Sequence, residues 1–326
     1  MAQGFENSVD AANSNFNSAT AGQTNKYFLP AIYSKKVQNA FRKSSVVEAI
    51  TNTDYQGEIS AFGDSVRIVK EPTIAVFAYS RGLSTASGEE QLSDQETQLI
   101  VDKANAFQFK VDDIEKSMSH VNWKEVAASS AAYSLKDAFD VDVLSTMLAG
   151  VSTSAPDNLI GADAAAGTAG LNETAASVDL TGSDGTGVDA LDLLARLARK
   201  LDDQNIPEEG RFVTAGPDFY EELSRTDSKL MSVDYNGGQG SVRNGLVSSG
   251  MLRGFSMYKT NNMPNGSTAN VVIGGHISAT STAQTILKTE TIRDNDSFGD
   301  ICRGLHVYGS KVLRPEALTA AYYVID

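Results

Sequence analysis

Alternating apolar and polar positions predict two strands within residues 54–112. In the stretch GDSVRIVK the apolar side chains Val66 and Ile68 fall on one face, and in ANAFQFKV Phe107 and Phe109 do the same. The polar stretch STASGEEQLSDQETQ separates these two runs. We therefore predict an extended hairpin with a polar tip. Such a hairpin buries little surface by itself, so we expect it to lie on another subunit.

The longest helical pattern covers residues 111–150, which contain no proline and are rich in alanine in the middle. Gly150 is the expected C-terminal stop, and a break is expected near residues 119–122. Trp123, the only tryptophan, is expected to anchor a core or a domain junction rather than to stack on a ligand. A second, amphipathic helix is predicted over residues 188–205, with acidic residues at its positive N-terminal end.

Loop and strand patterns make up most of the remaining chain. Residues 151–187 are rich in Ala, Gly, Ser, Thr and Asp, which is typical of a loop or an insertion. Residues 211–225 predict a short buried strand, a turn at Gly216-Pro217 and a helix, and residues 250–264 and 270–277 are strand-like. The pattern as a whole indicates an α+β fold.

The first 30 residues form a polar stretch rich in Asn, Ser and Ala, which suits an arm that becomes ordered only against a partner. Residues 30–50 carry a loose helical stripe of apolar positions. This segment also holds a small basic cluster, made of Lys35, Lys36, Arg42 and Lys43. A solvated helix face explains the cluster more simply than a binding patch does, and both readings stay open.

The composition is that of a water-soluble globular protein, with 41% hydrophobic and 21% charged residues among 326. No apolar run reaches the length of a transmembrane helix, and the N-terminus does not have the pattern of a secretory signal. The single cysteine, Cys302, excludes an internal disulfide and fits a reducing compartment. The formal net charge of −14 argues against a chain that clamps nucleic acid phosphates.

Residues able to carry catalysis are few. The three histidines have no metal-ligand spacing, and Cys302 lies in a strand-rich region where an inert buried thiol is the simpler reading. The glycine-rich stretch NGGQGSVRNG, residues 236–245, lacks the G-K-[ST] ending of a phosphate loop. The sequence therefore predicts no enzyme, no cofactor and no metal site.

A charged corner, Arg314-Pro315-Glu316, separates the two apolar, strand-like runs that close the chain. Pro315 has no N–H to give to a strand ladder, so it marks a bend or an edge. Residues two apart in an extended chain point to the same side, so Arg314 and Glu316 are expected to form an ion pair, within the subunit or across to a neighbour. The corner is thus predicted to be a structural brace.

Three stretches carry a resemblance to a known family: NIPEEGRFVTAGPDFYEEL (205–223), GMLRGFSMYKTNNMP (250–264) and FGDICRGLHVYGSKVLRPEAL (298–318). Together with the order of arm, hairpin, long helix, mixed α/β region and closing strands, they resemble the major capsid proteins of tailed double-stranded DNA bacteriophages. The resemblance implies a Hong Kong 97 type capsid fold.

On this resemblance the chain divides into five parts. They are an N-terminal arm with a short helix (1–50), an extended hairpin or E-loop (51–112), a peripheral domain with the spine helix and an insertion (113–204), an axial domain (205–285), and C-terminal strands that return to the peripheral domain (286–326). The hairpin is expected to lie across the neighbouring subunit.

The resemblance also implies a function without catalysis. Copies of the chain would assemble as hexamers and pentamers into an icosahedral head that encloses double-stranded DNA without binding it specifically. No long charged helical segment precedes the arm, so a separate scaffolding protein is expected. A portal protein at one vertex is a further expected partner, the presence of a decoration protein stays open, and no membrane is expected. The expected location is the virion, after assembly in the bacterial cytoplasm.

Charged residues on the hairpin and at the closing corner are the candidates for contacts between subunits. They are Arg67, Lys70, Glu71, Arg81, Glu89, Glu90, Arg314 and Glu316. Exposed ion pairs contribute only about 0–1 kcal/mol each, so their number over many copies would matter more than any one pair. No Lys–Asn pair with a catalytic Glu matches the cross-linking chemistry of some relatives.

Three alternatives remain at this point. An encapsulin, which forms a nanocompartment around cargo enzymes, shares the fold but usually begins with a cargo-docking helix. An acidic cytosolic α/β enzyme would form a small oligomer instead of megadalton particles. A tail or decoration subunit would differ in the symmetry of its assembly.

Overall fold

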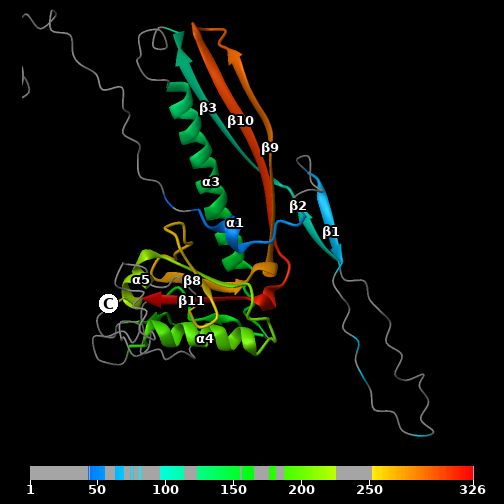
Figure 1. The fold of residues 1–326 in the computed structure, drawn as a ribbon, viewed down its shortest axis with the longest axis vertical. Helices are drawn as coiled ribbons and strands as arrows, with labels where there is room; N and C mark the ends of the chain where they lie inside the picture. Colours follow the sequence, from blue (N-terminus) through cyan, green and yellow to red (C-terminus); the bar gives the residue numbers. More distant parts are fainter. Residues whose placement is uncertain are drawn as a thin grey trace, which may run out of the picture.

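The computed structural model describes residues 43, 45–55, 63–69, 74, 76, 81, 96–113, 123–154, 156–164, 176–180, 187–224 and 252–325. The fold is α+β and elongated (Figure 1). One end is a long, narrow sheet with a single long helix beside it. The other end is a broader sheet between layers of helix.

A three-stranded antiparallel sheet forms the narrow end. Its strand order is β3-β10-β9, with β3 at Lys103–Asp112, β10 at Gly299–Val312 and β9 at Thr280–Arg293. Helix α3 (Trp123–Ala149) lies along one face of this sheet (Figure 1). The contact includes Phe139 of α3, whose ring meets Tyr308 of β10 edge-on with the ring centroids 5.2 Å apart.

A six-stranded sheet forms the other end. Its members are β4 (Leu159–Ile160), β5 (Val178–Asp179), β6 (Arg211–Ala215), β7 (Ser256–Lys259), β8 (Asn270–His276) and β11 (Leu318–Val324). The order is β4-β11-β8-β6-β7, and β5 also pairs with β11. Both parallel and antiparallel pairs occur, so the sheet is mixed.

This sheet is buried on both faces. Val272 of β8 packs into a core with α4 (Ala190–Asp202) and α5 (Pro217–Leu223), whereas Val271 and Ile273 pack into a second core with α3. Successive strand residues point to opposite faces, so β8 supplies apolar side chains to both cores. The second core also holds Val47 and Ile50 of α1 (Val47–Ile50).

Several predicted elements are confirmed. Helix α3 ends at Ala149, and Gly150 follows because a Cβ there would lie 2.4 Å from Val312. Helix α4 carries the predicted amphipathic face, and the side chain of Asp189 caps it by accepting a hydrogen bond from the Leu191 N–H at 3.1 Å. The predicted strand, turn and helix at 211–225 appear as β6 and α5.

The predicted pairing of the hairpin is wrong in one respect. Strand β1 (Ser65–Val69) pairs with β2 (Glu96–Ile100), while the alternating run around Phe107 forms β3 and pairs with β10. The sequence of β2 is ETQLI, in which only Leu99 is buried. Burial alternates along β2, but the inner face holds the polar Thr97 beside Leu99 and the apolar Ile100 is exposed, so the sequence shows no apolar alternation and the pattern missed the strand.

The closing strands belong to different sheets. Strand β10 pairs with β3 and β9, and β11 pairs with β8, so the segment 286–326 is shared between the two ends of the molecule. Between them the corner forms a short 3₁₀ turn, η8 (Pro315–Ala317), rather than an extended bend. A second 3₁₀ turn, η7 (Ile277–Ala279), separates β8 from β9 in the same way.

Several predictions fall outside the described residues. They concern the arm (1–30), the basic cluster apart from Lys43, the break near 119–122, most of the hairpin tip and the glycine-rich stretch at 236–245. Of Trp123 the structure gives only its place as the first residue of α3.

Candidate assembly surfaces

Arg67, a predicted interface residue, has a partner within its own subunit. Its guanidinium lies 3.6 Å from the carboxylate of Glu96, across the β1–β2 pair. Both side chains are at least half exposed, at 69% and 50%. An ion pair in this setting contributes about 0–1 kcal/mol, and the exposed guanidinium keeps donors for a second contact.

The other hairpin candidates are less well placed. Arg81 is exposed in a turn, and Lys70, Glu71, Glu89 and Glu90 lie outside the described residues. An interface role for these side chains stays a prediction.

Backbone contacts hold the corner at Arg314. Its N–H and that of Leu313 both donate to the carbonyl of Ala279, at 3.1 and 2.8 Å. The Asn158 amide donates to the Glu316 carbonyl at 2.8 Å. Within the part of the chain that the structure describes, the side chains of Arg314 and Glu316 form no ion pair with each other. The corner therefore braces the two sheets through its backbone, which leaves both charged side chains available to a neighbour.

The far end of the narrow sheet holds a cluster of ion pairs that the sequence pattern did not reveal. Lys110 of β3 reaches Asp294, after β9, with 2.5 Å between nitrogen and oxygen. Arg293 pairs with both Asp113 and Asp300. The hydrogen bonds from Lys110 and Ser297 hold the pKa of Asp294 well below its usual range. These pairs tie the ends of β3, β9 and β10 together.

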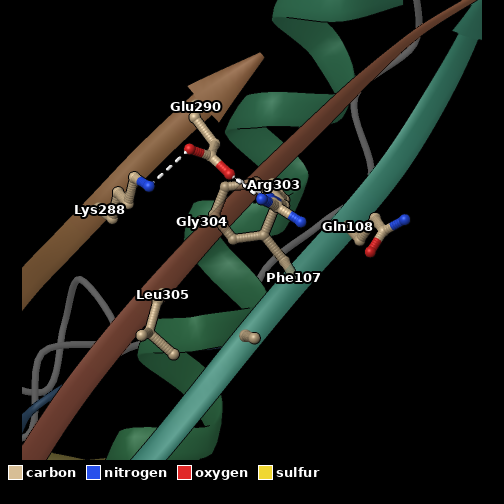
Figure 2. Close-up of a pocket in the computed structure, with 8 residues that line it drawn as sticks. Phe107, Gln108, Lys288, Glu290, Arg303, Gly304 and Leu305 are labelled. Atoms are coloured by element: carbon tan, nitrogen blue, oxygen red, sulfur yellow. Dashed lines mark hydrogen bonds and ion pairs between the residues drawn. The ribbon is translucent and has the colours of Figure 1, made fainter. Parts of the chain in front are cut away.

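A shallow groove of about 530 Å³ lies on the narrow sheet. Figure 2 shows its lining, which is Ala106, Phe107, Gln108, Lys288, Glu290, Arg303, Gly304 and Leu305. Glu290 accepts from Lys288 at 2.8 Å and also pairs with Arg303. These two hydrogen-bonded cations lower the pKa of Glu290.

The groove opens away from α3. In β10 the side chains of Arg303 and Leu305 are exposed, whereas those of Cys302 and His306 are buried. His306 faces α3, because its ring centroid lies 6.0 Å from that of Phe139. Strand residues alternate between faces, so Arg303 and Leu305 mark the opposite side of the sheet.

The buried histidine and cysteine on the inner face serve packing. His306 contacts the Gln284 amide oxygen through Nε2 at 3.2 Å, and its ring is stacked beside Tyr308. Burial lowers the pKa of His306, which favours the neutral ring. Cys302 is 7% exposed, which confirms that the thiol is buried, and its lack of reactivity stays a prediction.

Helix α1 is fixed to α3 by a buried carboxylate. Asp140, which has no exposed surface, accepts hydrogen bonds from the Ser45 hydroxyl at 2.9 Å and from the Val46 N–H at 3.1 Å. Burial raises the pKa of Asp140 despite these two bonds. The N–H of Lys43 also donates to the hydroxyl of Tyr133 at 2.9 Å. The segment that leads into α1 is thus held along α3.

Two further polar anchors order loops of the broad sheet. The guanidinium of Arg211 pairs with Asp202 at 2.7 Å and donates from Nε to the carbonyl of Pro207 at 2.9 Å. Asp163 accepts from three successive backbone N–H groups, those of residues 267–269, which lower its pKa. Gly266 is required beside it, because a Cβ would lie 2.2 Å from that carboxylate.

Two other kinds of site are not found among the described residues. No described helix is both long and apolar enough to span a membrane. The same residues contain no group of three or more His, Cys, Asp or Glu side chains able to hold a metal ion.

The fold is shared with solved phage capsids. Over 91% of this chain and 97% of the other, it matches a structure of Mycobacterium phage Che8, with a TM-score of 0.66 and 25% identity. The capsid structure of the cyanophage P-SCSP1u matches over 99% and 100%, with a TM-score of 0.69 and 19% identity. The capsid of an empty GTA particle has a TM-score of 0.63 and 14% identity over 94% and 99%. No curated protein sequence matches. The shared fold is that of capsid proteins of the phage type.

The family assignment follows from the sequence itself. The family described as phage capsid protein matches residues 95–321. This chain belongs to that family, and it is a structural, non-enzymatic protein of the major capsid type found in tailed phages. The predicted fold class and the predicted absence of an enzymatic role agree with this assignment, and the encapsulin alternative is not favoured.

Proposed function

We propose that copies of this chain assemble as hexamers and pentamers into an icosahedral head that encloses phage double-stranded DNA. The observation that carries the proposal is the family match over residues 95–321, joined to a fold match over 99% of the chain with a cyanophage capsid. The location that follows is the virion, after assembly in the bacterial cytoplasm.

The charge balance supports an enclosing role for the shell. The net charge is −14, so the chain as a whole repels phosphate groups. A shell that gripped DNA would hinder both its packaging and its release. The DNA is therefore enclosed without sequence-specific binding.

Partners other than the chain itself complete the proposal. A separate scaffolding protein directs assembly, a portal protein occupies one vertex, and a decoration protein binds the finished shell. The hairpin between β1 and β2 acts as a strap over the neighbouring subunit. Support for the strap comes from its short described base, which has five residue pairs between β1 and β2 and in which Leu99 packs against Val307 of β10.

Expression of the full chain, alone and with its candidate scaffolding protein, tests the proposal. Sedimentation should show megadalton particles, and negative-stain microscopy should show closed shells with fivefold vertices. A small oligomer under both conditions would contradict the proposal, and an assembly of another symmetry would favour a tail or decoration subunit.

A further inference from the structure

The hairpin turn Asp294–Gly299, here called the tip, joins β9 to β10 at the end of the narrow sheet farthest from the broad sheet (Figure 1). Phe298 at this tip is 79% exposed. Its backbone is nevertheless fixed, because its carbonyl accepts from the Asp113 N–H at 3.1 Å. Lys110 also holds the turn, through Asp294 and Ser297. The tip is thus a rigid support for an exposed aromatic ring.

A ring presented in this way is suited to binding. Burying a Phe side chain removes a large apolar area from water, which stabilises a complex. A side chain on an already ordered turn loses little further conformational freedom when it docks, so more of this energy appears as affinity. Buried aromatic anchors of this kind dominate many protein interfaces.

The tip is also acidic. Asp296 is exposed beside Phe298, and within the described residues its carboxylate forms no ion pair. Phe298 and Asp296 together present an aromatic ring next to a free negative charge.

The groove on the outer face of the narrow sheet complements the tip, because it combines apolar surface with positive charge. Leu305 and Ala106 give it apolar surface, and Lys288 and Arg303 share the single carboxylate of Glu290. Two cations with one carboxylate leave a net positive charge. The groove volume of about 530 Å³ lies within the range of pockets that hold small ligands.

The tip cannot reach the groove of its own subunit. Strand β10 runs from the tip to Leu305, paired with β3 on one side and with β9 on the other. At about 3.3 Å per strand residue, Gly299 lies about 13 Å along β10 from Arg303 and about 20 Å from Leu305. Only a second copy can bring a tip to this groove.

We propose that the tip of one copy docks Phe298 and Asp296 into the groove of a neighbouring copy. The contact is heterologous, so each copy offers one tip and one groove, and a series of such contacts closes into a ring or a shell. The inference rests on the proposed function, because it requires many copies in one assembly.

Site-specific photo-crosslinking tests the contact directly. The full chain with p-benzoylphenylalanine in place of Phe298 is assembled, irradiated and digested. The expected product is a dimer of the chain, with the cross-link mapped to residues 103–110 or 284–305 of the second copy. The same probe at Val141, a 43% exposed position on α3, is the matched control and should not label these segments.

Charge exchange provides a second test. Asp296→Lys should lower the particle yield at least tenfold, and adding Lys288→Glu in the same chain should restore most of it. Glu208→Lys, at another exposed acid, should leave the yield within twofold. Urea unfolding of each unassembled variant shows whether the subunit still folds.

The outcomes of these experiments distinguish the proposed function from the proposed contact between tip and groove. Failure of the unmodified chain to form particles overturns the proposed function and this inference with it. Particles in which the probe at position 298 labels another surface or nothing overturn this inference alone, as does a double variant that stays unassembled although folded.

Discussion

Arg211 shows how one buried side chain can order a loop. Its side chain is 2% exposed, and it binds Asp202 together with the carbonyls of Ile206 and Pro207. The guanidinium supplies several donors in a fixed plane, which suits three acceptors on a short loop.

Arg211→Met should therefore destabilise the unassembled subunit by about 2–4 kcal/mol, since two buried carbonyls lose their donor. Urea unfolding followed by circular dichroism measures the change. The control is Arg199→Met, because Arg199 is 66% exposed and lies 3.7 Å from Asp203. That variant should stay within about 0.5 kcal/mol of the unmodified chain. An equal loss of unfolding free energy in the two variants would contradict the role of Arg211 in ordering the loop.

Asp140 predicts a pH dependence. Burial raises its pKa in the folded state, so its contribution to stability is fully present below the unfolded pKa and is lost as pH rises through the raised value. Asp140→Asn keeps an acceptor for the Val46 N–H but cannot ionise. The unfolding free energy of the variant, relative to the unmodified chain, should rise between pH 4 and pH 7. If the unfolding free energies of the two proteins changed in parallel with pH, folding would not disfavour the ionised form of Asp140.

Replacing Arg314 is expected to reduce assembly without changing the stability of the isolated subunit. Its backbone forms the corner, while its side chain has no ion pair with Glu316. Arg314→Ala should change the unfolding free energy of the isolated subunit by less than about 0.5 kcal/mol and should reduce particle yield. Glu316→Gln tests the neighbouring charge in the same pair of measurements. Normal yield from both variants would remove the corner from the set of interface candidates.

At the scale of elements, the register of β1 and β2 gives a sharp test of the strap. Val69 lies directly opposite Glu96, so an Asn-Gly turn can replace residues 70–95 without disturbing either strand. We expect this variant to be folded and monodisperse and to form no shells, by thermal unfolding and electron microscopy.

The matched control replaces residues 70–95 with a Gly/Ser segment of equal length. If this segment supports assembly, the reach of the hairpin matters rather than its side chains. Normal particles from the Asn-Gly variant would contradict the strap.

Element prediction succeeded where the apolar pattern was strong and local. Helix α4 buries Leu191, Leu194 and Leu201 on the predicted face, and β6 is buried throughout. It failed for β2, whose identity as a strand depends on a long-range partner rather than on its own alternation. The ion pairs at the tip were missed for the same reason, because Lys110 and Asp294 are 184 residues apart in sequence.

At the scale of the whole molecule, the charge of −14 predicts weak affinity for DNA. In 150 mM salt the unassembled subunit should not retard a duplex at micromolar concentration, since it lacks the net positive charge that releases counterions. An electrophoretic mobility shift assay measures this. A shift below about 1 μM protein would contradict the enclosing role and point to the basic cluster at residues 35–43.

The sequence by itself determined the fold class, the main helices and the family. Those features depend on local periodicity, on composition and on short stretches such as residues 205–223, and all three can be read along one chain. The tertiary structure alone decided that β10 and β11 lie in different sheets. It also decided that the corner braces through its backbone, and that a rigid aromatic tip and a cationic groove occur on one sheet. The physical reason is that each of these depends on strand pairing between distant segments, which is fixed only when the whole core is packed.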